Sequence, residues 1–210
     1  MRIDFVSDVA CPWCAVGLNA LELALARIGD DIAVDIHFQP FELNPGMAPE
    51  GADAAAYLKA KYGMDDAQLA HNRGVIRERG AAVGFAFGER AHVWNTFDAH
   101  RLLHWAGLQG RQRELKHALL QAYHGQGRNP GALEVLLELA TQAGLDAVQA
   151  RAVLAEGRYA DEVRSAEQHW QQAGIHSVPS IVINDRHLIQ GGQPAEVFEQ
   201  ALRQIAEQES

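Results

Sequence analysis

The chain has 210 residues, which suffices for one large domain or for one domain that carries a sizeable insertion. Its composition, 48% hydrophobic and 21% charged, is that of a globular protein with a well-buried core and excludes collagen-like and disordered chains. The formal net charge of −9, with no block of lysine or arginine, argues against nucleic acid as a partner, because an acidic surface repels phosphates.

Residues 1–40 predict a strand, a helix and a second strand. Residues 3–6 form a short apolar run, and a helix is expected to begin near Pro12, since proline lacks an N–H that the first helical turn would leave unpaired. This helix should end at Gly29. Residues 32–38 alternate between apolar and polar side chains, which indicates a strand, and Pro40 closes it. A unit of this length is a parallel β-α-β motif.

The middle of the chain, residues 50–173, is predicted to be entirely helical because no alternation of useful length interrupts it. Polar residues mark the expected helix starts and glycines the expected ends, at Asp53, Asp98 and Asp146 and at Gly63, Gly80, Gly144 and Gly174. Strand signals return at residues 178–184, where a turn at Asn184 and Asp185 predicts a hairpin with residues 187–189. A final amphipathic helix follows Gly192.

This order of elements places parts of an α/β domain on both sides of a helical block. We expect residues 1–45 and 170–210 to form one discontinuous domain and residues 46–169 to form an all-helical insertion. No apolar run reaches the roughly 18 residues of a membrane span, and residues 1–6 are too short and too charged for a signal peptide. We therefore expect a cytoplasmic protein with no membrane partner, and the oligomeric state stays open.

The two cysteines lie three positions apart in the segment Cys11-Pro12-Trp13-Cys14. Structural disulfides are rare in the cytoplasm, and a C-x-x-C beside a β-α-β unit is typical of a thioredoxin-like redox motif. This spacing places both sulfurs on one helix face, and the helix N-terminus favours the thiolate of Cys11. Cys11 is therefore the expected nucleophile and Cys14 the resolving thiol. The alternatives are a chance pair of inert cysteines and half of a zinc site, which would need two further ligands.

Val178-Pro179 is the second signal, because proline is disfavoured within a central strand. A cis peptide bond at this point would turn the chain tightly and hold bare backbone near the cysteines. That backbone could pair with an incoming peptide or thiol in the manner of an added strand. The alternative is a trans proline that merely opens an edge strand.

Together these motifs resemble the DsbA family, and within it the FrnE-like branch. The resemblance rests on the C-P-W-C segment after the first strand, on a helical insertion, and on Val178-Pro179 before the third strand. Residues 95–102, 174–179 and 191–193 (N-T-F-D-A-H-R-L, G-I-H-S-V-P and G-G-Q) are similar to stretches of that branch. The resemblance implies a thioredoxin-like fold with a helical insertion, disulfide exchange chemistry, and a cis bond at Pro179.

Trp13 departs from the family pattern, since the periplasmic relatives carry histidine between the proline and the second cysteine. Indole has no charge with which to stabilise a thiolate, so we expect Cys11 to be acidic for a thiol but less acidic than in those relatives. Because stabilising the reduced form is what makes such a protein an oxidant, the disulfide here should be a milder one.

Candidate contacts with substrate are Pro12, Trp13, Val178, Pro179, His176, Asn95 and His100. His176 lies three residues before Pro179 and could approach Cys11 as a thiolate stabiliser or proton carrier, although a surface loop position is the favoured interpretation. We expect Asn95, His100 and Arg101 to face the redox centre or the domain interface; the resemblance implies that they are important but assigns no specific role to each.

The expected activity is disulfide exchange with protein or small-molecule thiols, with no cofactor required and glutathione as a candidate redox partner. His100 and His104 lie one helical turn apart, but no glutamate of the protease type stands between them, so no metal is expected. One rival is a glutathione-dependent isomerase or kappa-class-like transferase, which the insertion pattern also resembles and in which serine typically stands at the place of Cys11. Another is a binding module or chaperone on a redox fold. Substrate and net direction stay open.

Overall fold

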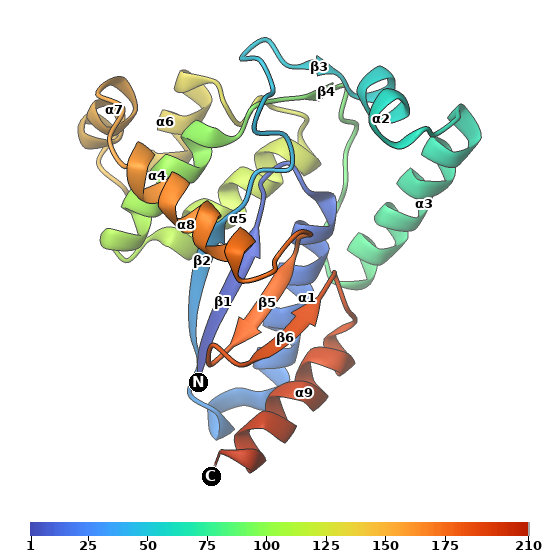
Figure 1. Cartoon of the computed structure of the whole chain (residues 1–210), viewed down its shortest axis with the longest axis vertical. Helices are drawn as coiled ribbons and strands as arrows, with labels where there is room; N and C mark the ends of the chain where they lie inside the picture. Colours follow the sequence, from blue (N-terminus) through green and yellow to red (C-terminus); the bar gives the residue numbers. More distant parts are fainter. Residues whose placement is uncertain (210) are drawn as a thin grey trace.

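The computed structural model describes residues 1–209 and contains a four-stranded mixed sheet with helices on both faces (Figure 1). The strand order is β2-β1-β5-β6, with bounds β1 Arg2–Ser7, β2 Asp35–Pro40, β5 Ser180–Ile183 and β6 His187–Gln190. Strand β1 is parallel to β2 and antiparallel to β5, and β5 is antiparallel to β6. Phe5 pairs with both Phe38 and Ile181, so two neighbours fix the central strand.

Alternate residues of β1 belong to two different cores, as the two-residue period of a strand requires. Ile3 and Phe5 pack with α1 and α9, which contact each other on one face of the sheet. Val6 packs on the other face with Trp170 of α8. The helices that cover the two faces are α1 Pro12–Ile28 and α9 Ala195–Gln208 on one side and α8 Ala160–Gln172 on the other, and a 3-10 turn η1 at Gly29–Asp31 follows α1.

Helix α1 begins and ends where its sequence predicts. Pro12 occupies the first helical position, and Gly29 closes the helix with φ of 61°, its N–H bonded to the carbonyl of Leu25. The helix is largely buried because it lies between the sheet, α9 and α3. It therefore holds the residues at its N-terminus in a fixed position.

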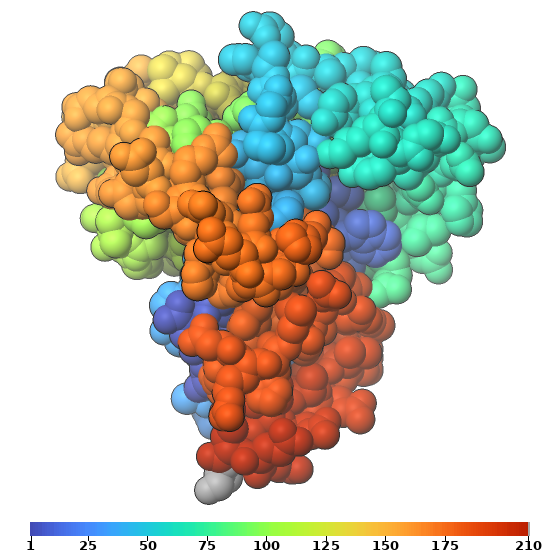
Figure 2. All heavy atoms as spheres, in the orientation of Figure 1, coloured from blue at the N-terminus to red at the C-terminus, as the bar shows by residue number. Residues whose placement is uncertain are grey.

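The segment between β2 and α8 forms a second group of helices. This group lies beyond the C-terminal end of β1, near the start of α1 (Figure 1). Its elements are β3 Ala52–Asp53, α2 Ala54–Tyr62, α3 Asp66–Ala82, β4 His92–Val93, α4 Phe97–Leu108, α5 Gln112–Leu120, the π-helical turn η2 Gln121–Gly125, α6 Leu133–Gln142 and α7 Ala147–Ala155. A core rich in leucine and alanine joins α4 to α7 and includes Trp105 and Tyr123. The molecule is broad at these helices and narrow at α9 (Figure 2).

The insertion is not all helical, contrary to expectation, because β3 and β4 pair as a short antiparallel ribbon. Strands of two residues are too short to produce the alternation by which a sequence predicts them. Helix α3 also continues past Gly80, which we expected to end it. A Cβ at Gly80 would lie 2.5 Å from the Phe87 ring, so this glycine permits close packing of the following loop.

Two boundaries also differ from expectation. Helix α8 extends to Gln172, so the expected domain boundary between residues 169 and 170 falls inside a helix. Strand β2 begins at Asp35 because its pairing with β1 begins there. The hairpin turn is as predicted, with φ of 50° at Asn184 and 55° at Asp185. Within residues 1–209, no helix has both the length and the apolar character of a membrane span.

Candidate active site

The end of β1 and the start of α1 place the first cysteine at a helix N-terminus. Asp8 begins the connecting turn, and its carbonyl accepts a hydrogen bond of 3.2 Å from the N–H of Cys11. Cys11 is the N-cap residue of α1, with φ of −90° and ψ of 115°, and Pro12 follows at the first helical position. The N–H of Cys14 lies 3.1 Å from the carbonyl oxygen of Cys11. The two side chains therefore share one face of the first helical turn.

The two cysteines are free thiols that differ sharply in acidity. Cys11 is 4% exposed and Cys14 is fully buried. A hydrogen bond from the Cys14 thiol lowers the pKa of Cys11, and the backbone N–H groups of Cys14 and Trp13 add to this against the effect of burial. Burial raises the pKa of Cys14 well above its ordinary range, and the hydrogen bond to Cys11 raises it further. Cys11 is thus the sulfur that ionises first.

Two loops from the C-terminal part of the chain close around this pair. The peptide bond between Val178 and Pro179 is cis. The Cys11 thiol donates a hydrogen bond of 3.5 Å to the carbonyl oxygen of Val178. The carbonyl of Pro179 accepts a hydrogen bond of 2.8 Å from the N–H of Gly191. These contacts place the carbonyl of Val178 at the Cys11 sulfur and tie the loop at Gly191 to the proline loop.

Gly17 lets the proline loop approach α1. A Cβ at Gly17 would lie 3.0 Å from Cγ of Pro179 and 3.4 Å from Cα of Gly192. We expect Gly17→Ala to destabilise the protein by about 1–3 kcal/mol through overpacking. The same substitution should slow disulfide exchange, because the loop at Pro179 must move away from Cys11.

Gly74→Ala is the matched control for that prediction. Gly74 lies within α3, and a Cβ there would meet nothing within 4 Å. Alanine should therefore raise stability by roughly 0.5–1 kcal/mol, since it is the better helix former. Denaturant midpoints and exchange rates of the two variants give the comparison; equal effects at both positions would contradict the role assigned to Gly17.

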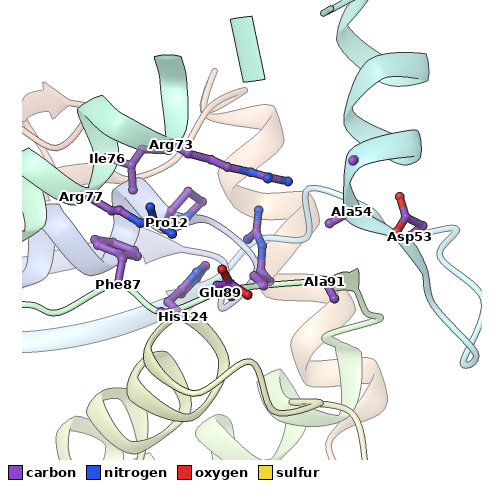
Figure 3. A pocket seen from close by; sticks show the side chains of 13 residues that line it. Pro12, Asp53, Ala54, Arg73, Ile76, Arg77, Phe87, Glu89, Ala91 and His124 are labelled. Atoms are coloured by element: carbon purple, nitrogen blue, oxygen red, sulfur yellow. The ribbon is translucent and has the colours of Figure 1, made fainter. Parts of the chain in front are cut away.

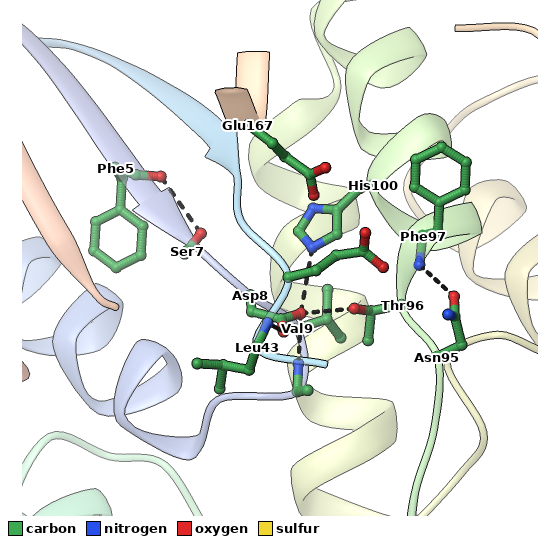
Figure 4. A network of polar contacts seen from close by, with 12 residues as sticks. Phe5, Ser7, Asp8, Val9, Leu43, Asn95, Thr96, Phe97, His100 and Glu167 are labelled. Carbon is green, nitrogen blue, oxygen red and sulfur yellow. Dashed lines mark hydrogen bonds and ion pairs between the residues drawn. The ribbon is translucent and has the colours of Figure 1, made fainter. Parts of the chain in front are cut away.

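Asp8 organises the turn before Cys11 through a buried hydrogen-bond network (Figure 4). Its carboxylate accepts from the N–H groups of Ala10 at 3.0 Å and Leu43 at 2.7 Å, and from the Thr96 hydroxyl at 2.8 Å. The His100 ring nitrogen Nε2 lies 3.3 Å from the same carboxylate. Burial works against the charge, but His100 and the backbone donors hold the pKa of Asp8 below its ordinary value. The retained negative charge raises the pKa of Cys11.

Two buried basic residues of the insertion approach the same region, and the sequence did not single out either. Lys116 of α5 is 1% exposed, and burial lowers its pKa. Its charge lowers the pKa of Cys14. His124, in the turn η2, places Nε2 2.8 Å from the carbonyl oxygen of Val9. Burial, with help from nearby Arg90, lowers the pKa of His124 to about 3, so this imidazole is neutral.

The remaining predicted residues take up varied positions. Pro12 and Trp13 are half-buried beside Cys11, whereas His176 is exposed, and no hydrogen bond joins it to Cys11 within residues 1–209. The amide of Asn95 donates to the carbonyl of Met47 at 2.9 Å and accepts from the N–H at the start of α4. Asn95 therefore fixes a loop of the insertion.

Arg101 was expected to face the redox centre or the domain interface, but it binds within the insertion. Its guanidinium donates to the carbonyls of Arg158 at 2.8 Å and Val153 at 2.5 Å, which joins α4 to the end of α7. His104 packs against Tyr159, with ring centroids 5.1 Å apart and ring planes tilted by 34°. In the part of the chain that the structure describes, no group of three or more side chains is arranged to hold a metal ion.

Comparisons with known proteins agree with this architecture. The family model of the DSBA-like thioredoxin domain matches residues 2–203. A probable DsbA oxidoreductase from Streptomyces coelicolor is 41% identical in sequence, and its crystal structure superposes with a TM-score of 0.91 over 97% of this chain and 89% of that chain. The uncharacterized protein YwbO of Bacillus subtilis is 28% identical over 203 residues, 96% of each chain. The cytosolic disulfide reductase DsbM from Pseudomonas aeruginosa, crystallised with GSH, shares the fold at 17% identity and a TM-score of 0.67, over 99% of this chain and all of that chain.

Proposed function

Since the chain belongs to the family of DSBA-like thioredoxin domains and is a thiol–disulfide oxidoreductase, we propose that Cys11 and Cys14 are its reacting pair. The observation that carries this proposal is the placement of Cys11 at the N-terminus of α1 and of the fully buried Cys14 within its first turn. It separates the two thiols into one that ionises readily and one that stays protonated. A nucleophile and a resolving thiol need this difference.

The proposed reaction has two steps. The Cys11 thiolate attacks one sulfur of a substrate disulfide RS–SR′; a bond from Cys11 to the RS sulfur forms, the RS–SR′ bond breaks, and R′S⁻ leaves with the electron pair. Cys14 then loses its proton and attacks the Cys11 sulfur, which forms the Cys11–Cys14 disulfide and releases RS⁻. Two electrons pass from the dithiol to the substrate, and two external thiols return them. The reverse sequence oxidises a substrate dithiol.

The backbone beside Pro179 is proposed to orient the substrate. The carbonyl oxygen of Val178 lies at hydrogen-bond distance from the Cys11 sulfur. A substrate segment that reaches this sulfur therefore passes Val178 and Pro179 and can pair with their backbone groups, while Pro12 and Trp13 border its path. These contacts need only a short stretch of extended chain, so both peptides and small thiols fit the proposal.

Glutathione is the proposed redox partner, because exchange of this kind needs a thiol source and no metal or nucleotide. The disulfide reductase DsbM, which has the same fold, was crystallised with GSH and is cytosolic. We extend both features to this protein as proposals. Two molecules of glutathione would reduce the Cys11–Cys14 disulfide and leave as glutathione disulfide, so atoms and electrons balance.

Trapping with Cys14→Ser tests the proposal directly. The variant should accumulate a mixed disulfide at Cys11 when it meets glutathione disulfide, and catalytic turnover should fall by about a hundredfold or more because no resolving thiol remains. Cys11→Ser is the control and should form no adduct. An isomerase or transferase that activates glutathione at position 11 would be largely indifferent to the loss of Cys14, and that result would refute the dithiol mechanism.

Trp13→His tests the effect of the uncharged side chain between the cysteines. Trp13 is half-buried against Gly192, where a Cβ would lie 3.3 Å from the indole ring. An imidazolium at this position should lower the pKa of Cys11 and make the disulfide more oxidising. The reduction potential should rise by ~30 mV for each tenfold increase in the equilibrium constant that favours the dithiol over the disulfide. Titration of the thiolate absorbance measures the acidity; an unchanged or raised pKa would count against this explanation.

A further inference from the structure

A cavity of about 280 Å³ opens beside the nucleophile, between α2, α3 and the loop that leads to β4 (Figure 3). Pro12, the residue after Cys11, forms part of its wall. Arg73 and Arg77 of α3 line it, and the side chain of Arg73 extends across it. Because these arginines are four residues apart, they lie on one face of the helix and project into the same space.

Arg73 and Arg77 are unusual among the arginines of residues 1–209, because their side chains have no partner. Among the arginine side chains in residues 1–209, only Arg73, Arg77 and Arg186 form no hydrogen bond or ion pair. Other arginines of this acidic chain bind carboxylates or carbonyl groups, as the pair Arg128–Glu138 illustrates. Two of the three unpaired guanidinium groups therefore line the cavity that Pro12 borders, where each has donors free for a ligand.

The inner wall of the cavity connects it to the loop that carries the nucleophile. Arg90 lines the cavity and donates a hydrogen bond of 3.1 Å to the carbonyl of Ala10, the residue before Cys11. His124 also lines it and holds the carbonyl of Val9. A molecule bound here would thus lie against Pro12, the residue after Cys11, and against the side chains that hold the carbonyls of Val9 and Ala10.

The charge of the lining is positive despite two acidic residues. Three arginines face two carboxylates, those of Asp53 and Glu89. Asp53 is already occupied, since it accepts a hydrogen bond of 2.8 Å from the N–H of Ala56 at the start of α2. In a chain with net charge −9, a positive cavity beside the reactive sulfur favours anionic molecules over others.

We propose that Arg73 and Arg77 bind the carboxylates of a low-molecular-weight disulfide and present its sulfur to Cys11. This rests on the proposed function and specifies its substrate class. The volume of the cavity suits a small molecule, and paired guanidinium groups match carboxylates in geometry and charge. Exchange follows the two steps given above, with the dithiol supplying two electrons and an external dithiol restoring them.

The kinetic test compares three disulfides that differ in charge: glutathione disulfide (anionic), bis(2-hydroxyethyl) disulfide (neutral) and cystamine (cationic). The wild type should react fastest with the anionic disulfide. In the double variant Arg73→Ala/Arg77→Ala, the ratio of kcat/KM for the anionic disulfide to that for the cationic one should fall by about a hundredfold, or tenfold per arginine. An unchanged ratio would overturn the proposal.

Arg186→Ala is the matched control, because it removes the same unpaired charge from the opposite end of the sheet. Arg186 lies in the β5–β6 turn. This turn is beside the pairing of Ile183 with Ile3 near the start of β1, whereas Cys11 follows the end of that strand. Its selectivity ratio should equal that of the wild type. A loss as large as in the double variant would show a general charge effect and refute a site at Arg73 and Arg77.

A binding measurement separates this proposal from the dithiol mechanism. S-methylglutathione carries the carboxylates but has no free thiol, so calorimetry reports binding without exchange. Its Kd should rise by at least about tenfold in the double variant and stay unchanged in Arg186→Ala. If the protein binds S-methylglutathione selectively but exchanges no disulfide, the proposed function is refuted and the binding site is not. If all three proteins have equal Kd values, only the binding site is refuted.

Discussion

Lys116→Met should slow the resolving attack of Cys14 by about tenfold to a hundredfold at neutral pH, so that the mixed disulfide at Cys11 persists. Burial raises the pKa of Cys14, and the charge of Lys116 lowers it, as does a hydrogen bond with the backbone of Asp8. Burial lowers the pKa of Lys116, and the charge of a Cys14 thiolate raises it, so the ionised forms of the two groups favour each other. Lys116 further lines a cavity of about 310 Å³ between β2, α4 and α5, through which a proton can reach solvent.

The same substitution should stabilise the fold by about 1–4 kcal/mol, because methionine fills a similar volume without a buried charge. A slower enzyme with a higher denaturation midpoint would separate the chemical effect from any loss of structure. Rapid quenching followed by mass spectrometry gives the lifetime of the mixed disulfide. Lys59→Met, at an exposed lysine of α2 that pairs with Asp66, is the control; equal lifetimes in the two variants would contradict the role of Lys116.

Acid should destabilise the protein between pH 6.5 and about pH 3 because His124 stays neutral in the fold. The ordinary pKa of histidine is near 6.5, and burial lowers the value for His124 to about 3. In that window the unfolded chain binds a proton that the folded chain does not, so stability falls as pH falls. The slope approaches 1.4 kcal/mol per pH unit, or about 2 kcal/mol between pH 6.5 and 5.

His124→Gln isolates this contribution. An amide can replace the hydrogen bond from the imidazole to the carbonyl of Val9, but it does not titrate. Denaturant unfolding across this pH range should show a shallower slope in the variant, with the difference close to one proton. His176→Gln, at an exposed histidine, should keep the wild-type slope. A variant at position 124 that loses stability as steeply as the wild type would show that another group causes the acid effect.

The sequence predicts those parts of the fold that depend on local signals. Pro12 and Gly29 mark the two ends of α1, and the turn at Asn184 and Asp185 needs residues that tolerate positive φ. The dithiol segment and Val178-Pro179 were recognisable for the same reason, since each is a short motif with a known stereochemical use. Their meeting at one sulfur follows from β1 and β5 lying next to each other in the sheet.

Local pattern could not reveal the groups that set the charge around the dithiol. Lys116 is buried at a position where lysine is ordinarily exposed, and only the packing of α5 near Cys14 accounts for it. His124 lies in a π-helical turn that no periodicity predicts. Arg77 belongs to a charged run whose simplest interpretation is a solvated helix face. Each gains its significance from contacts between segments distant in the chain.

Asp8, Cys14 and Lys116 together determine how readily the two cysteines ionise. The buried carboxylate of Asp8 holds the turn before Cys11, yet its charge opposes the thiolate that the reaction needs. The helix N-terminus and the Cys14 thiol lower the pKa of Cys11 in spite of this, while Lys116 favours ionisation of Cys14. Charges contributed by the insertion therefore tune a dithiol that the sheet and α1 hold in place.

Redox equilibration of the protein shows whether Cys11 and Cys14 form a reversible disulfide. The protein is held in buffers of graded thiol-to-disulfide ratio, its free thiols are alkylated, and its mass is measured. We predict that Cys11 and Cys14 convert together, in one two-electron transition, to a species that is two hydrogens lighter and resists alkylation at both positions. A chain whose mass and alkylation stay the same at every ratio would contradict the account.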